Sequence, residues 1–246
     1  MKIIYDQLLS ETDFFDKFLI LLILLFPIAL CFSIFLADMF ASVAALSIVY
    51  LFVFKRNKEL FFNIKTQFYF FILFYLIILL SLIFSSSFEE SFLPSFFYFR
   101  YFLFVVGIYY LLEKYSFFSK ILLYSLIITF FIIFIDSTKQ FFFGKNFFNY
   151  PLGMDPTPYI TSFFGDEKKL GSYLVRLLPL VLSLMYFLNF KKFDIYLIIT
   201  FGVFIFLSSE RTALFLYLVI IFFSFLISKN RIKFFLIGFL IFFTLF

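Results

Sequence analysis

The sequence contains no histidine and no tryptophan, and it has only one cysteine and seven glycines. Without histidine, these residues cannot form a Ser-His-Asp triad or a histidine-ligated metal site. The single Cys31 excludes an intramolecular disulfide and a thiolate metal cluster. The sequence also lacks a glycine-rich phosphate loop and any metal-ligand spacing. We therefore expect neither a metal nor another cofactor.

Charged residues are also scarce, at 14% of the chain, whereas average soluble domains carry about a quarter. Hydrophobic residues make up 65%, and the mean hydropathy is +1.12. A soluble protein of this composition could not cover its surface with polar groups. In lipid, helices satisfy their own backbone hydrogen bonds, so the composition predicts an all-α, polytopic transmembrane helix bundle.

Apolar runs that approach the roughly 20 residues needed to cross a bilayer predict about eight complete spans. We place them at 17–37, 39–54, 66–84, 97–112, 119–135, 170–188, 195–208 and 212–228. Only Asp38 separates the first two spans, so they should form a tight hairpin. A ninth apolar run begins at Phe234 and is too short to span. We therefore expect a truncated ninth span and a chain that is the first part of a longer protein.

The short gaps between these spans hold most of the 20 lysine and arginine residues, and the net charge is +5. A cytoplasmic N-terminus puts thirteen of them on the cytoplasmic side and five on the other, in correct alternation. Basic residues dispersed in this way do not form the stripe typical of nucleic-acid binding. We expect a multi-pass protein surrounded by membrane lipids, with no nucleic-acid partner.

One connection, 136–169, is much longer than the others and lies on the extracytoplasmic side in this topology. Its glycines and prolines exclude one regular helix, yet it also carries several phenylalanines. Irregular backbone at membrane depth is tolerated only against protein or a water-filled cavity. The segment is therefore either a re-entrant loop or a plain cap on a single transmembrane domain that covers residues 1–246.

Three arginines lie where a positive charge is unfavourable. Arg100 and Arg176 fall in the outer halves of the fourth and sixth spans, and Arg211 opens the eighth. A midplane arginine costs roughly 2.5–3.5 kcal/mol on insertion scales, so intramembrane charge indicates function by default. The alternatives are that Arg100 and Arg176 snorkel to lipid headgroups and that Arg211 is an interfacial anchor paired with Glu210.

Taken together, the three arginines lie on the outer side of three different spans. Guanidinium groups stay charged in low dielectric and bind phosphate oxygens in bidentate fashion. This arrangement suits the diphosphate of a lipid-linked substrate. The acidic residues in the same layer are Asp136, Asp155, Asp166, Glu167 and Glu210. Their spacing singles out none of them as a catalytic group.

Several short motifs follow one another along the chain. They are Ser95 to Arg100 (SFFYFR), Asp136 to Gln140 (DSTKQ), Phe143 to Asn146 (FGKN), Ser162 to Glu167 (SFFGDE), Leu170 to Pro179 (LGSYLVRLLP) and Ser209 to Ala213 (SERTA). With these motifs in this order, the chain resembles the first half of the O-antigen ligase and O-antigen polymerase family. The resemblance covers nearly the whole chain.

The resemblance implies a glycosyltransferase of the bacterial inner membrane that acts at the periplasmic face in lipopolysaccharide biosynthesis. Such an enzyme takes a glycan from an undecaprenyl-diphosphate carrier and passes it to lipid A-core or, in the polymerases, to another carrier-linked glycan. The positions that match the family's diphosphate-binding arginines are Arg100, Arg176 and Arg211. Supporting candidates are Asp136, Gln140, Asp166, Glu167, Lys168, Lys169 and Glu210.

Two features depart from the family's pattern. The ligases carry a large periplasmic loop with a histidine in their later half, which these residues lack, so we expect this portion to be inactive alone. The arginine that often precedes the Ser-Phe-Phe-Gly stretch is replaced by Tyr159 to Thr161, and Lys168 or Lys169 could take its role. The alternatives are an O-antigen polymerase, a transporter or flippase of lipid-linked sugars, and a structural membrane subunit in which the arginines are dispensable.

Overall fold

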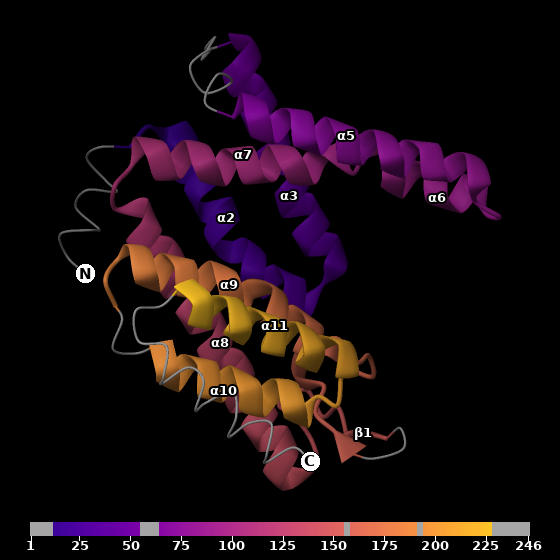
Figure 1. Cartoon of the computed structure of the whole chain (residues 1–246), viewed down its shortest axis with the longest axis vertical. Coiled ribbons are helices and arrows are strands. Elements are labelled where there is room, and N and C mark those ends of the chain that lie inside the picture. The colour runs from indigo at the N-terminus through magenta and orange to yellow at the C-terminus, as the bar shows by residue number, and fades with distance from the viewer. Residues whose placement is uncertain (1–11, 55–63, 155–157, 191–193, 228–246) are drawn as a thin grey trace. The chain divides into compact units, whose positions relative to one another are not determined.

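A computed structural model describes residues 12–54, 64–154, 158–190 and 194–227, and α-helices dominate this part of the chain (Figure 1). The helices are α2 (Phe14–Phe32), α3 (Ile34–Phe54), α5 (Lys65–Ser81), α6 (Phe88–Phe96), α7 (Phe99–Lys114), α8 (Phe118–Phe143), α9 (Leu170–Phe187), α10 (Asp194–Leu207) and α11 (Arg211–Ile227), with the 3-10 helices η1 (Leu82–Phe84) and η2 (Ser162–Phe164). The strands β1 (Gly153–Met154) and β2 (Pro158–Tyr159) form a short antiparallel ribbon.

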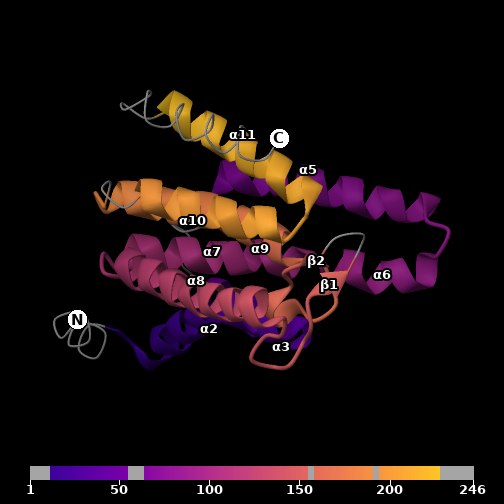
Figure 2. The same ribbon diagram turned by 90° about the horizontal axis from the view of Figure 1, so that it is seen from below.

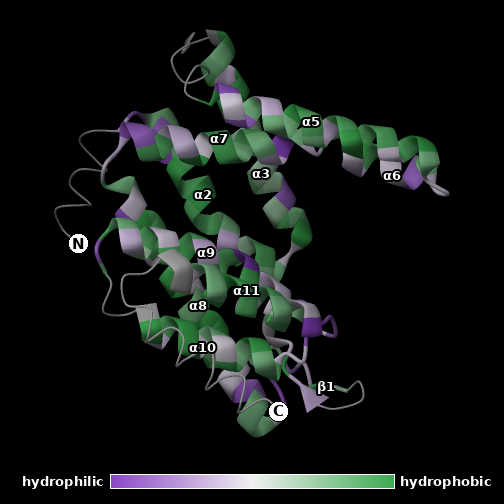
Figure 3. Cartoon of the chain, viewed as in Figure 1, coloured by the Kyte–Doolittle hydropathy of each residue, from purple (hydrophilic) through white to green (hydrophobic). Residues whose placement is uncertain are grey.

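The composition of these helices confirms the predicted all-α bundle. Six helical segments in the described residues are long and apolar enough to cross a membrane, and two shorter apolar helices follow them at 195–207 and 211–224. Figure 3 shows that hydrophobic residues cover most of each helix and that hydrophilic residues concentrate near helix ends. This is the distribution that a bilayer requires, because lipid covers the helix flanks and water reaches only the ends.

The structure differs from the predicted spans in three places. The first hairpin turns at Ser33, so Asp38 lies inside α3 instead of in the turn. The short helix α6, between η1 and α7, was not predicted. The fifth span continues to Phe143, so the long connection begins at Gly144 and not at 136. The predicted ninth span from Phe234 lies outside the described residues.

The contacts divide the chain into two compact units, 1–121 and 122–246, which we describe separately. In the first unit, α3 packs against both α2 and α7. Small residues on one face of α3 permit this close approach: Ala37, Ala41, Ala44 and Ala45 are all buried. On α7, a Cβ at Gly107 would lie 3.3 Å from Ile48, so the absence of a side chain there brings α7 against α3.

In the second unit, α9 packs against α10 and α11 (Figure 2). Aromatic rings join α8 to α10. The Phe130 and Phe201 rings are 4.6 Å apart, and those of Phe134 and Phe204 stack at 4.5 Å. The buried Tyr217 of α11 donates a hydrogen bond to the Ile198 carbonyl of α10 at 2.7 Å. These contacts fix the ends of α8, α9, α10 and α11 that carry the predicted site.

Candidate functional site

One end of the second unit gathers the C-terminus of α8, the connection 144–169, the end of α10 and the first residues of α9 and α11. We call this the loop end. The Ile160 amide donates to the Leu207 carbonyl at 3.0 Å, which ties the connection to α10. The Gly171 amide donates to Glu210 at 2.7 Å, which brings the starts of α9 and α11 together. Several of the predicted site residues therefore lie at one end of one unit.

Asp136 and Gln140 lie one turn apart on α8, and both are fully buried. The Asp136 carboxylate accepts hydrogen bonds from Ser162 Oγ at 2.8 Å, from the Phe147 amide at 2.9 Å and from Asn146 Nδ2 at 3.4 Å. A buried carboxylate needs such donors because it has lost its hydration. Asp136 thus fastens the connection to the helix, and both of its carboxylate oxygens already accept hydrogen bonds.

Gln140 has the same effect through its amide group. Its Oε1 accepts from the Thr161 amide at 3.0 Å and the Ser162 amide at 2.8 Å. Its Nε2 donates to the Pro151 carbonyl at 2.9 Å and to Thr161 Oγ1 at 3.1 Å. From the sequence we expected Asp136 and Gln140 to be supporting residues, and the structure brings them together as anchors of the connection. It adds Asn146 and Ser162, which occur in the motifs of the resemblance but were not expected to be site residues.

Glu210 forms the contact between α11 and α9. Its carboxylate accepts from the Gly171 and Ser172 amides at 2.7 and 3.0 Å and from Ser172 Oγ at 2.5 Å. The first amides of a helix have no partner within the helix, and a carboxylate there also interacts favourably with the helix dipole. Glu210 is therefore a cap for α9, and the interpretation that it pairs with Arg211 finds no support among its described contacts.

Arg176 and Arg211 lie on the two helices that this contact joins, and both are exposed. Arg211 is the first residue of α11, directly after Glu210. Arg176 lies five residues after Gly171, which is about 7–8 Å along the axis of α9, on the face opposite the buried Val175 and Leu178. In the part of the chain that the structure describes, neither guanidinium takes part in an ion pair.

The remaining candidates of the loop end are near the surface. Lys169 forms an ion pair with Glu167, so its charge is partly neutralised. Lys168 Nζ lies 4.4 Å from the centre of the Tyr159 ring, a cation–π contact. Asp166 is exposed. Arg176 and Arg211 are therefore better placed than Lys169 to offer an uncompensated positive charge.

Arg100 belongs to the first unit, and it has a carboxylate partner. Its Nη2 lies 2.9 Å from Asp38 Oδ2 and donates to the Tyr101 hydroxyl at 3.1 Å, and that hydroxyl donates to Asp38 at 2.6 Å. Arg100 is fourteen residues from Lys114 on α7, or about 21 Å, whereas the hydrocarbon layer is about 30 Å thick. A Lys114 at one membrane surface would place Arg100 within the apolar layer. The pairing explains how its charge is tolerated there.

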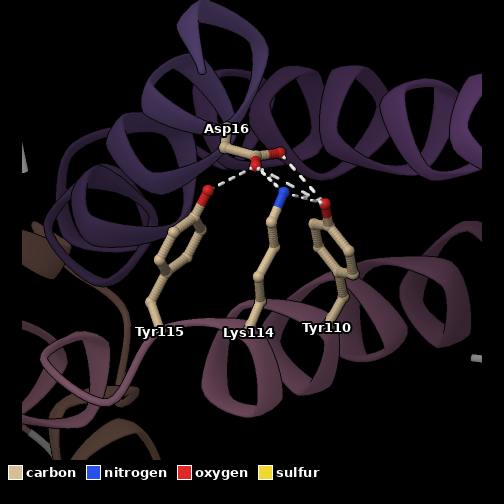
Figure 4. A network of polar contacts seen from close by, with 4 residues as sticks. All are labelled: Asp16, Tyr110, Lys114 and Tyr115. Carbon is tan, nitrogen blue, oxygen red and sulfur yellow. Dashed lines mark hydrogen bonds and ion pairs between the residues drawn. The ribbon is translucent and has the colours of Figure 1, made fainter. Parts of the chain in front are cut away.

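A second charged cluster lies at the other end of α7 (Figure 4). The fully buried Asp16 of α2 receives Lys114 Nζ at 2.6 Å, the Tyr115 hydroxyl at 2.7 Å and the Tyr110 hydroxyl at 3.3 Å. Burial and the hydrogen bond to Asp16 raise the pKa of Tyr115 to about 12. From the sequence, Asp16 directly precedes the first predicted span, 17–37, and was not expected to take part in a cluster. The spacing of Tyr110 and Lys114, one helical turn apart, is the signal that was overlooked.

The loop end carries two guanidiniums, those of Arg176 and Arg211, without an ion pair among the described residues, and such groups suit an anion better than a metal ion. Among the described residues, no group of three or more cysteine, aspartate or glutamate side chains could hold a metal ion together. Comparison of the chain with models of known protein families, with curated protein sequences and with solved structures found no match.

Proposed function

We propose that the chain is a membrane glycosyltransferase of the O-antigen ligase kind, which holds an undecaprenyl-diphosphate-linked glycan at the loop end of its second unit. One observation carries the proposal: Arg176 and Arg211 are exposed, without an ion pair among the described residues, on two helices whose starts are joined by Glu210. Two guanidiniums on neighbouring rigid helices suit a diphosphate, which offers several oxygens to bidentate donors.

The chemistry requires this positive charge at the leaving group. An acceptor hydroxyl attacks the anomeric carbon of the donor glycan, the new glycosidic bond forms, and the bond from that carbon to the carrier diphosphate breaks. The diphosphate departs with additional negative charge, and the acceptor proton passes to a base that we do not assign. Fixed positive groups at the departing oxygens stabilise the transition state more than the ground state. Arg176 and Arg211 would supply them.

The proposal places the loop end on the periplasmic side of the bacterial inner membrane, with eight spans and a cytoplasmic N-terminus. Two contacts within the first unit support this alternation. Asp16 pairs with Lys114 at one end of α7, and Asp38 pairs with Arg100 near the other end. Within this unit α2 therefore runs opposite to α3 and α7, which is consistent with the positive-inside assignment.

The structure also bears on the transporter alternative. A transporter of anionic lipids needs unpaired polar groups along a path, but in both charged clusters of the first unit the cation pairs with a carboxylate. Arg100 Nε is the part of these clusters that lacks a hydrogen-bond partner among the described residues. The acceptor, either lipid A-core or another carrier-linked glycan, distinguishes the ligase from the polymerase. Analysis of products in cells would separate the two, since a ligase yields glycan on lipid A-core and a polymerase yields longer carrier-linked chains.

Binding of undecaprenyl diphosphate and undecaprenyl monophosphate to the chain in lipid nanodiscs tests the proposal. A hydrogen bond between charged groups contributes about 1.5–3 kcal/mol, so Arg176→Ala or Arg211→Ala should weaken diphosphate binding roughly ten- to hundredfold. Lys145→Ala removes an exposed charge from the same end and is the matched control. Equal affinities of both arginine variants, the control and the unmodified protein would refute the assignment.

A further inference from the structure

A groove on the second unit lies between α8 and α10, away from the loop end, and its volume is about 460 Å³. Its floor consists of Leu123, Phe130, Met185 and Phe201, which are all buried. Exposed side chains form its walls, among them Phe131 at 64% and Tyr196 at 70% exposure. The groove therefore has an apolar floor of buried side chains, and a slender apolar ligand would fit it.

The lining of the groove offers an occupant almost no free hydrogen-bonding group. Thr200 is its one aliphatic hydroxyl, and that hydroxyl already donates to the Tyr196 carbonyl at 2.8 Å. Water in such a groove would find few partners, because a stable buried water needs two to four polar groups. The helices around it have membrane-spanning composition, so the surrounding solvent is hydrocarbon. The lining is complementary to a lipid chain.

The groove has a closed end and an open end. Its lining follows α8 from Leu123 to Phe134, about 16 Å at the rise of a helix. Phe134 stacks on Phe204 at 4.5 Å, so these rings join α8 to α10 on the side of the loop end. Among the described residues, no ring stack joins the two helices at the opposite end, near Leu123 and Tyr124, and we call this the open end. The groove is separate from the proposed diphosphate site.

A lysine stands at the open end. Lys120 lies on α8 one turn before Tyr124, and it shares a helical face with Tyr124, Ile127 and Phe131, because residues four, seven and eleven positions apart align on a helix. Its side chain is exposed. No ion pair involves it in the described part of the chain. A positive charge at the mouth of an apolar groove favours a ligand with an anionic head.

We propose that this groove holds one acyl chain of an anionic phospholipid, whose headgroup Lys120 binds at the open end. Hydrocarbon fills the groove, and the phosphate stays at the membrane surface where the α8 helix begins. Tyr124 and Tyr196 place amphipathic rings near the same end, as residues at membrane interfaces do. The site does not depend on the proposed function, because it uses none of the residues of the loop end.

The absence of tryptophan from the chain permits a direct test. Phe131→Trp puts a single tryptophan in the groove wall, and Phe215→Trp puts one at an equally exposed position on α11 outside the lining. Each variant is reconstituted in mixed phosphatidylglycerol and phosphatidylcholine, with one lipid brominated at a time to quench fluorescence. One lysine near an anionic headgroup contributes about 1 kcal/mol, so brominated phosphatidylglycerol should be enriched about fivefold at Phe131→Trp. We expect a ratio near one at Phe215→Trp.

Second substitutions in the Phe131→Trp variant separate the contribution of the lipid headgroup from that of the acyl chain. Lys120→Ala should reduce the enrichment to about one. Ile127→Phe, which fills the groove, should lower quenching by both lipids, while Ile128→Phe on the next position of α8 lies outside the lining and should change neither. Tyr196→Trp is the second reporter if Phe131→Trp fails to elute as a folded protein.

Three outcomes would overturn the proposal. The first is equal enrichment in the groove and on α11, and the second is unchanged enrichment in Lys120→Ala. The third is loss of the enrichment when undecaprenyl phosphate is added in equimolar amount, which would assign the groove to a polyprenyl chain.

Discussion

The pair Asp16 and Lys114 provides a quantitative test of what holds α2 to α7. Asp16 is fully buried, whereas the Lys114 side chain is 38% exposed, so the two partners differ in what their loss leaves behind. Lys114→Met leaves a buried carboxylate with only tyrosine donors. Removal of one partner of a buried pair costs about 3–5 kcal/mol, and we expect about 3 kcal/mol because water already screens the lysine.

Asp16→Asn should be milder. The asparagine oxygen still accepts the Tyr115 hydroxyl, and Lys114 keeps its hydrogen bond to the Tyr110 hydroxyl at 2.9 Å and its contact with water. We expect a cost of about 1 kcal/mol, the net value of one typical hydrogen bond. The double variant contains no buried charge and should also lose about 1 kcal/mol. The coupling between the two sites is then about 3 kcal/mol.

Thermal unfolding in one detergent, followed by the loss of monodisperse protein, measures all four proteins. For a chain of this size, about 3 kcal/mol corresponds to a fall in the midpoint of roughly 6–12 °C for Lys114→Met. The double variant should unfold at a higher temperature than Lys114→Met. Additive effects, with the double variant the least stable, would show that Asp16 is not buried as a charge against Lys114.

Two further predictions concern the caps and the pH dependence. Gly171→Ala should destabilise the second unit by about 1–3 kcal/mol, because the new Cβ would collide with Ser208 Oγ and lie 3.0 Å from Ala213 Cβ. The double variant with Ser208→Ala should recover part of this loss, and a melting series without any recovery would contradict it. The pKa of Tyr115 is raised, so the folded state favours its neutral form; the resulting stabilisation is complete below pH 10 and is lost as the pH rises through about 12. The difference in absorbance at alkaline pH between the protein and Tyr115→Phe should show that midpoint, and a midpoint near 10 would argue against the contact with Asp16.

Hydropathy located most helices because crossing a bilayer imposes a length and a composition on each segment. Hydropathy did not locate a helix end that depends on hydrogen-bond partners in another segment of the chain. α8 continues past residue 135 to Phe143 because Asp136 and Gln140 find hydrogen-bond donors and acceptors in the connection that follows. Seen locally, two polar residues after an apolar run look like the end of a span. Only the folded connection shows that they are buried.

The candidate site shows the same division. The sequence identified the arginines by their unfavourable depth, but it could not tell which had partners. The structure gives Arg100 a carboxylate from α3, sixty-two positions away, and leaves Arg176 and Arg211 unpaired among the described residues. It also assigns Glu210 to the first amides of α9 instead of to the adjacent Arg211. The roles of these arginines in binding a diphosphate stay predictions.

By itself, the sequence determined that this chain forms an apolar helical bundle, because long continuous apolar runs are typical of spanning helices, which satisfy their own backbone in lipid. The tertiary structure decided which charges cancel one another. Ion pairs and caps join residues far apart in the chain, such as Asp16 with Lys114 and Gly171 with Glu210, and their energies depend on distances of a few ångströms that no local pattern encodes.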